Sequence, residues 1–456
     1  MLREWISKIY LKSTIPSSAR ALGKTSPSIP NGTSPPQNQL HISSDSETSH
    51  ANPKKRNELQ DLTEARPDSF IRYQYPKLLD ENRAAVAKLV NAPLETIAFV
   101  TNATVGVNTV FRNLKWNSDG KDVVINFSTI YGACGKVIDY MTDFYDGLVS
   151  SKEIPLTYPV EDDAIIQKFR DAVKEIEADG KRPRIVVMDV VSSLPGVRFP
   201  WEKLVPVCRE LGVLSMVDGA QGIGMVSLDL SAVDPDFFVS NCHKWLHVPR
   251  GSAVFYVPVR NQHLIATTLA TSHGYVPRKA NRMNPLPPSS KSPYVTNFEF
   301  VGTMDNSPYL CMVDAIAWRQ DVLGGEEKVL AYLWDLNKTG SKLIAERLGT
   351  QVLDNSTGTL TNCSMANVAL PIWVGQPGPK AKDTDTVLTA EESAKSFQWI
   401  LNTLMHDYNT FLALFIHDGR YYARVSAQVY LDLDDYEYGA KALQDVCARV
   451  AKKEFL

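Results

Sequence analysis

Short apolar runs alternate with amphipathic stretches along most of the chain. The segment LLDENRAAVAKLV places Leu79, Val86, Leu89 and Val90 at helical spacing, so it predicts a helix that ends near Asn91. Further on, five apolar runs are typical of strands buried on both faces: DVVINF, RIVVMDVV, VLSMVD, FFVS and AVFYVP. The stretches between them, AIIQKFRDAVKEIEAD and WEKLVPVCREL, have the period of helices. This alternation predicts an α/β fold with a mostly parallel sheet and helices on both of its faces.

The pattern changes at two points, which divides the chain into three parts. Residues 1–60 contain SPSIPNGTSPPQNQ and SSDSETSHANPKKR, which have too few apolar residues to fold, so we expect an N-terminal extension that is disordered or lies outside the family pattern. Residues 61–323 form the predicted large domain. Beyond about residue 323, the helical segments EEKVLAYLWDLNKTGSKLIAERL and ESAKSFQWILNTLMHDY flank short strands. Residues 324–456 are therefore predicted to form a smaller α+β domain.

The net charge and the cysteines limit the partners and the cellular compartment that we expect for this protein. A net charge of -3 argues against nucleic acid as an obligatory partner, and no apolar run reaches membrane-spanning length. The six cysteines are scattered without a C-x-x-C pair, which fits neither a disulfide framework nor a zinc site. We expect buried thiols in a reducing compartment, the cytoplasm. The basic, acid-poor start MLREWISKIYLKSTIPSSARAL is also typical of a mitochondrial transit peptide, although a disordered or misassigned start would look the same.

Polar residues that directly follow the apolar runs are the candidate site, because ligands of parallel α/β sheets bind at the carboxyl ends of strands. Asp218 follows VLSMV, and Lys244 follows FFVS within the segment Asn-Cys-His-Lys-Trp. A carboxylate and a lysine at neighbouring strand ends suit pyridoxal phosphate. The carboxylate would keep the pyridine nitrogen protonated, and the lysine would form the imine. The alternative is an Asp and a surface Lys that merely end their strands.

Three further positions could complete such a site. The segment TNATVG, residues 101–106, lies between an apolar run and a helical stretch, so its N–H groups could bind a phosphate, or its polar residues could simply cap the helix. Tyr131, in STIYGACG, could stack on a cofactor ring or be an ordinary core or surface tyrosine. Arg424, in YYARVSAQVY, could bind a substrate carboxylate through its planar fork or form a surface ion pair.

Five segments taken together resemble the class V aminotransferase family of fold type I pyridoxal-phosphate enzymes. They are VDGAQGIG, SNCHKWLHVPRG, TNATVGVNT, NFEFVGTMDNSP and ARVSAQVY. The resemblance extends from about Glu64 to the C-terminus. It implies pyridoxal 5'-phosphate as the cofactor, a large domain and a small C-terminal domain, and a homodimer with shared active sites.

Within this family, four segments are similar to the fungal hercynylcysteine sulfoxide lyases, carbon–sulfur lyases of ergothioneine synthesis. They are ARPDSFIRYQYPKLLDENRAAVA, STIYGACGKVIDY, VVSSLPGVRFPWE and FYVPVRNQHLI. For the cofactor, the resemblance implies Lys244 as the imine-forming lysine, Asp218 on the ring nitrogen and Gln221 near the phenolic oxygen. The implied phosphate ligands are Ala103, Thr104, Ser240 and His243.

The same resemblance implies roles on the substrate side. Tyr131 would stack on the ring and act as a proton donor, Arg424 would bind the substrate carboxylate, and Gly302 and Thr303 would reach the cofactor of the other subunit. Lys244 would remove the Cα proton, Cβ–S cleavage would expel a sulfenate, and the remaining fragment would hydrolyse to pyruvate and ammonia.

One segment of the family pattern has no counterpart here. Upstream of the part that matches ARPDSF, the family has an Asn-His-Gly-Ser-Phe-Gly-like segment on the substrate side, whereas this chain has the Ser/Pro-rich region ending in NPKKRNELQDLTE. Three alternatives to the lyase therefore stay open. They are a cysteine desulfurase, an epimerase or ring-forming enzyme of secondary metabolism, and a pseudoenzyme. The desulfurase is disfavoured because no cysteine lies in a recognisable Gly-rich mobile loop.

Overall fold

The large domain is built on a seven-stranded sheet, in which every strand expected from the apolar runs is present. The computed structural model describes residues 40–41, 53–279 and 282–456. The strand order is β2 (Ile97–Val100), β8 (Ala253–Tyr256), β7 (Phe237–Asn241), β6 (Leu214–Asp218), β5 (Arg182–Asp189), β3 (Asp122–Phe127) and β4 (Val149–Ile154). Strand β8 runs antiparallel to both of its neighbours, β2 and β7, and all the other pairs of this sheet are parallel. The expected mostly parallel α/β fold is confirmed.

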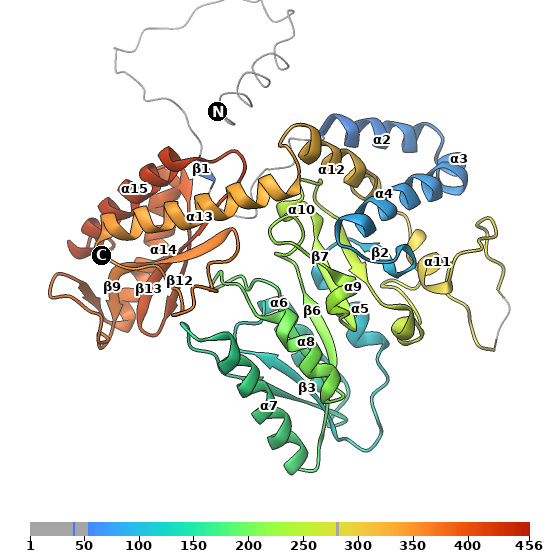
Figure 1. The fold of residues 1–456 in the computed structure, drawn as a ribbon, viewed down its shortest axis with the longest axis horizontal. Coiled ribbons are helices and arrows are strands. Elements are labelled where there is room, and N and C mark those ends of the chain that lie inside the picture. Colours follow the sequence, from blue (N-terminus) through green and yellow to red (C-terminus); the bar gives the residue numbers. More distant parts are fainter. Residues whose placement is uncertain (1–39, 42–52, 280–281) are drawn as a thin grey trace, which may run out of the picture.

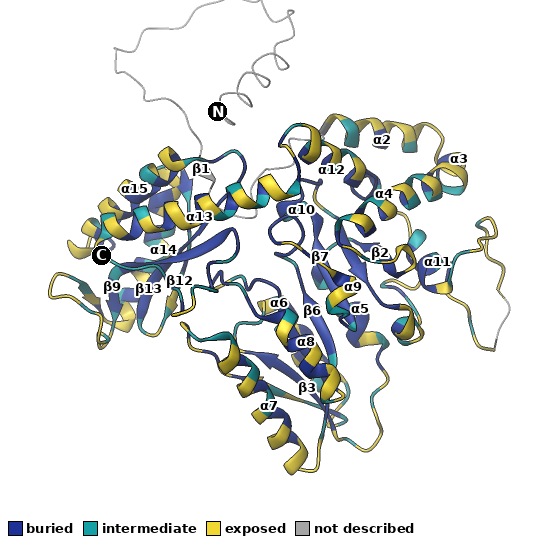
Figure 2. Cartoon of the chain, viewed as in Figure 1, coloured by how far each residue is buried: buried dark blue, intermediate teal, exposed yellow. Residues whose placement is uncertain are grey.

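Helices cover both faces of this sheet because successive residues of a buried strand point to opposite sides. On β5, Ile185 and Val187 join one apolar core, whereas Val186 and Met188 join the other. The first core packs against α5 (Ala103–Asn113) and α6 (Gly132–Phe144), and the second against α4 (Tyr75–Leu89), α7 (Asp162–Ala178) and α8 (Trp201–Glu210). Figure 2 shows the buried strands between helices whose outer sides are exposed.

The small domain has a four-stranded sheet in the order β10 (Thr386–Leu388), β9 (Met365–Val374), β13 (Arg420–Ser426) and β12 (Ala413–His417). Its helices are α14 (Ala390–His406), α15 (Leu433–Ala451) and the long α13 (Glu326–Leu348), as the sequence predicts for α13 and α14. Figure 1 shows α13 extending from the large domain along the small one. The predicted division at residue 323 falls in the turn between α12 (Met312–Asp321) and α13.

The expected disordered extension of residues 1–60 is wrong for its last part. Helix α2 runs over Pro53–Ala65, and its Leu59 side chain is buried in the large-domain core. The helix is held by tertiary contacts that its polar composition does not reveal. Leu40–His41 form a short strand, β1, that pairs with β11 (Thr410–Phe411). The remaining residues up to 52, with the predicted transit peptide, lie outside the described residues. Of the region that has no counterpart to the family segment, the last part, residues 53–64, lies in α2.

The expectations drawn from the cysteines and from hydropathy can be compared with the structure. All six cysteines are free and buried, as expected. Within the described ranges, no helix combines the length and apolarity needed to span a bilayer. The same ranges contain no cluster of His, Cys, Asp and Glu side chains suited to a metal ion.

Candidate active site

Asp218 and Lys244 come together at the carboxyl edge of the large sheet. Asp218 is the last residue of β6 and is 3% exposed, and Lys244 lies in the short helix α10 (Cys242–Trp245) directly after β7. The Asp218 carboxylate accepts hydrogen bonds from the Ala220 N–H at 2.9 Å and from the Cys134 thiol at 3.3 Å. Burial raises the pKa of Asp218, whereas these hydrogen bonds and the Lys244 charge act to lower it. Both predicted residues therefore face one site.

Tyr131 lies near Lys244. It precedes α6, its side chain is 48% exposed, and the Lys244 Nζ lies 6.0 Å from the centre of its ring. The ring therefore lies near the amine, and about half of the residue is exposed. This placement suits the predicted stacking and proton-donor roles of Tyr131.

A second carboxyl, which the sequence analysis missed, lies beside Asp218. Asp189 is the last residue of β5 and pairs with Asp218 across the two parallel strands. Burial, followed by the neighbouring Asp218 charge, raises the pKa of Asp189 well above its ordinary value. The signal was available, because Asp189 is the one charged residue that interrupts the apolar run RIVVMDVV before its end.

The start of α5 offers the expected phosphate turn. The Ala103 N–H donates to Asn241 Oδ1 at 2.9 Å, and the Val105 N–H donates to the capping Asn102 side chain at 2.9 Å. The Thr104 N–H has no hydrogen-bond partner among the described residues. A donor without a partner at the positive end of a helix is the chemistry that binds a phosphate.

The Ser240 side chain lies on the opposite face of β7 from the predicted phosphate turn. Its hydroxyl donates to the Gly219 carbonyl and accepts from the Ile223 N–H at 2.9 Å, on the opposite face of β7 from α5. The next residue, Asn241, faces α5 instead. The contacts of Ser240 therefore give no support to its predicted phosphate role, and Asn241 is the strand residue beside the phosphate turn. His243 Nδ1 lies 2.9 Å from the Ser252 carbonyl, which fixes the orientation of its ring.

Gln221 lies in the turn after Asp218 and is 3% exposed. Its Oε1 accepts a hydrogen bond from the Trp245 indole at 2.7 Å, which orients the amide. The amide also carries the Nε2 donors, which could serve a phenolic oxygen, as predicted for Gln221.

Arg424 links the small domain to the loop after β5. It is 4% exposed on β13, and its Nη1 donates to the Ser193 carbonyl at 2.7 Å and to the Ser193 hydroxyl at 3.2 Å. Its strand partner Asn367 bonds both backbone groups of Gly196, at 2.8 and 3.0 Å. A Cβ on Gly196 would lie 2.8 Å from Arg424 Cδ, so only glycine allows this approach. Arg424 is therefore a buried residue and not a surface one.

Gly302 and Thr303 lie on an exposed loop between α11 (Pro293–Glu299) and α12. Gly302 has φ +118°, a conformation that favours glycine. Asp305, two residues after Thr303, accepts hydrogen bonds from Arg56 at 3.0 Å and from Gln60 at 2.8 Å, both on α2. The loop is therefore anchored at one end and accessible to another molecule.

These residues fit pyridoxal phosphate. Asp218 is a buried carboxylate for the ring nitrogen, Thr104 supplies an unused N–H at a helix start, and Lys244 lies near the face of the Tyr131 ring. Each group required by the cofactor has a chemically matched partner at the same sheet edge.

Comparison with known proteins places the chain in a family. The family model Aminotransferase class-V matches residues 71–273. An L-cysteine desulfhydrase-like protein of Epichloe uncinata, lolT1, is 34% identical over 86% of this chain and 89% of its own. This chain belongs to the class V aminotransferase family. The family resemblance is thereby confirmed, and with it a pyridoxal-phosphate-dependent enzyme.

Another class V relative is the hercynylcysteine sulfoxide lyase of Schizosaccharomyces pombe. It is 28% identical, and the match covers 84% of this chain and 88% of the lyase. Among solved structures, a C-DES mutant with glycine covalently linked to its PLP cofactor superposes with a TM-score of 0.65 at 18% identity, covering 87% of this chain and 93% of C-DES. That similarity confirms the class V fold.

Proposed function

We propose that this class V enzyme is a carbon–sulfur lyase that acts on a cysteine-derived amino acid through Lys244. The observation that carries the proposal is the position of the Lys244 amine, which lies 6.0 Å from the Tyr131 ring and within electrostatic reach of Asp218. The relatives support the reaction class, because their names describe a cysteine desulfhydrase-like protein and a hercynylcysteine sulfoxide lyase.

The proposed substrate is a hercynylcysteine sulfoxide, with pyruvate and ammonia as the co-products on the way to ergothioneine. A cysteine desulfhydrase is the second candidate, favoured by the relative that is 34% identical. A desulfurase is disfavoured because it needs an accessible thiol to receive sulfur, whereas all six cysteines are buried. Burial also raises the pKa of Cys134, the thiol next to Asp218, which keeps it protonated.

Bound pyridoxal phosphate would act as an electron sink for the bond-breaking step. The chain's own residues would do the rest. Arg424 would bind the substrate carboxylate, and the Lys244 amine would remove the Cα proton. When the Cβ–S bond breaks with its electron pair on sulfur, the Tyr131 hydroxyl would donate a proton to the departing sulfenate. Asp218, as an ionised carboxylate, would keep the ring nitrogen protonated.

The remaining roles belong to the same proposal. Ala103, Thr104, His243 and Asn241 would surround the phosphate, and Gln221 would face the ring oxygen. Gly302 and Thr303 would reach the cofactor of a second copy, so the working unit would be a cytoplasmic homodimer. Their exposed loop supports this, since it is available to another molecule.

Replacement of Lys244 by Ala tests the cofactor assignment. Purified wild-type protein saturated with pyridoxal phosphate should be yellow and form a borohydride-reducible adduct, and Lys244→Ala should lose the adduct. A colourless saturated wild-type protein would overturn the assignment.

Parallel assays with hercynylcysteine sulfoxide and free cysteine separate the activities. Pyruvate from the sulfoxide alone supports the proposed lyase, whereas pyruvate with sulfide from cysteine indicates a desulfhydrase. Alanine from cysteine would indicate a desulfurase, and no product from either substrate a pseudoenzyme.

A further inference from the structure

A buried arginine behind the active-site edge joins the two turns that carry Asp218 and Lys244. Arg319, on α12, is 2% exposed. Its Nη1 donates to the Trp245 carbonyl at 2.9 Å, directly after Lys244, and its Nη2 donates to the Gly224 carbonyl at 3.1 Å, in the turn after Asp218. One rigid guanidinium therefore fixes the distance between the two turns.

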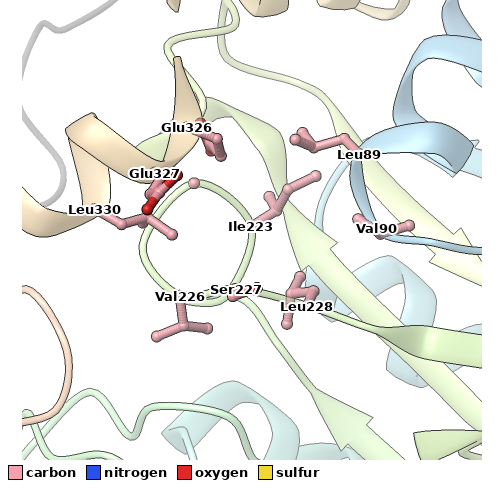
Figure 3. A pocket seen from close by; sticks show the side chains of 10 residues that line it. Leu89, Val90, Ile223, Val226, Ser227, Leu228, Glu326, Glu327 and Leu330 are labelled. Carbon is pink, nitrogen blue, oxygen red and sulfur yellow. The ribbon is translucent and has the colours of Figure 1, made fainter. Parts of the chain in front are cut away.

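The same guanidinium is held from the other side by α13. Glu326, the first residue of α13, accepts from Arg319 Nε at 2.6 Å and from Nη2 at 2.7 Å. This bidentate pair orients the arginine and balances its buried charge. Figure 3 shows Glu326 and Glu327 at the start of α13 facing the loop from Ile223 to Leu228. Further along α13, Trp334 donates to the Met225 carbonyl of that loop at 2.9 Å.

Two more contacts make the arrangement specific. His247, in the turn after Lys244, accepts from Arg319 Nη1 through Nδ1 at 3.1 Å. Gly224 has φ +80°, and a Cβ there would lie 2.6 Å from the Trp245 carbonyl oxygen, so the two turns pack backbone against backbone. A lysine at position 319 could satisfy one or two of these acceptors, but not all of them.

We propose that Arg319 is a positioning residue for Lys244, joining the lysine turn to the Asp218 turn and tying both to α13. The inference rests on the proposed role of Lys244. Arg319 is buried behind the two turns, and it would act through the backbone carbonyl of Trp245. Because α13 also packs along the small domain, where Arg424 lies, Arg319 connects the lysine to the domain that would hold the substrate carboxylate.

Arg83 provides a matched control. It is 4% exposed in the same domain and also bonds backbone carbonyls, those of Ile97 at 2.7 Å and Leu94 at 2.8 Å, and it pairs with Asp80. Its contacts lie on the helix α4 side of β2, not at the site. Arg319→Lys and Arg83→Lys therefore each remove a buried guanidinium that bonds backbone carbonyls. Only the Arg319 guanidinium bonds the turn that follows Lys244.

The test compares both variants with wild type by four measurements. They are Tm, kcat, the pH midpoint of the visible band of the lysine-bound cofactor, and, on cofactor-free protein, hydrogen exchange over residues 219–226 and 242–248. Both variants should have a lower Tm than wild type. Only Arg319→Lys should move the pH midpoint, speed exchange in both turns and lower kcat by about 10²-fold. If Arg319→Lys matches Arg83→Lys in midpoint and exchange, the positioning role is overturned.

A second variant covers the case in which Arg319→Lys does not fold. Glu326→Gln keeps the shape but weakens one side of the clamp, so it should move the midpoint in the same direction by less. An unchanged midpoint in Glu326→Gln would count against the proposal. Failure of the underlying function would appear separately, as an adduct that persists in Lys244→Ala.

Discussion

Asp189 and Asp218 are paired residues on neighbouring parallel strands, so their carboxyl groups emerge on the same face of the sheet at the same edge. Two buried carboxylates this close cannot both hold a charge without a large penalty. The hydrogen bonds decide which one does. Asp218 accepts from Ala220 and Cys134, whereas the Asp189 carboxyl has no hydrogen-bond partner among the described residues. Asp218 is therefore the ionised member and Asp189 the protonated one.

This assignment predicts different effects for the two amide variants. Asp189→Asn resembles the neutral acid and should change kcat by less than tenfold. Asp218→Asn removes the carboxylate charge that would keep the ring nitrogen protonated, and it should lower kcat by about 10²–10³-fold. Steady-state kinetics on cofactor-saturated protein would measure both. Equal losses in the two variants would show that the charge is shared, and a larger loss in Asp189→Asn would show that it sits on Asp189.

Arg424 and Arg420 lie on the same strand. Arg420 therefore serves as a control for the proposed role of Arg424 in binding the substrate carboxylate. Arg424→Lys loses the planar fork and should raise KM by about 10- to 100-fold, since hydrogen bonds to charged groups contribute about 1.5–3 kcal/mol. Arg420 instead stacks on Trp373 at 4.8 Å and donates to the Leu370 carbonyl. Arg420→Lys should lower Tm and leave KM near wild type. A similar KM rise in both variants would point to general loosening of the small domain.

His247 makes stability depend on pH. Burial, then the Arg319 charge, lowers its pKa from 6.5 to about 3 in the folded protein. Between these values the unfolded chain binds a proton that the folded chain excludes, so stability falls as pH falls below 6.5, by up to about 1.4 kcal/mol per pH unit.

His247→Asn removes this titration. Asn tolerates the φ of +63° at this position and can still accept from Arg319. Urea unfolding of cofactor-free protein across that pH window should give a shallower slope for the variant. Parallel slopes for variant and wild type would exclude His247 as the source of the dependence.

The sequence predicts those parts of the site that local pattern controls. Asp218 and Lys244 could be found because each directly follows an apolar strand, and strand ends of a parallel sheet meet at one edge. Asp189 follows the same rule and could have been found by it. Ser240 and Asn241 were harder to separate, because the choice between them depends on which face of β7 each one occupies, and that depends on the packing of α5.

Residues that act through tertiary contacts leave no such pattern. Arg319 lies on a helix, far along the chain from Lys244, and its partners are mostly backbone carbonyls, which any sequence possesses. Helix α2 was mistaken for part of a disordered extension because only Leu59 of its buried face is strongly apolar. Its contacts with Asp305 depend on a loop that comes much later in the chain.

The contact between α2 and Asp305 has a practical consequence for anyone who shortens this protein. A cut at residue 61, where the sequence pattern suggests that the folded part begins, would remove both Arg56 and Gln60 and leave the catalytic sheet intact. Such a truncated protein could still turn yellow and yet assemble poorly, because the loop with Gly302 and Thr303 would have lost its anchor. Weak activity of that truncated form would then result from the loss of this anchor and would not describe the full-length enzyme.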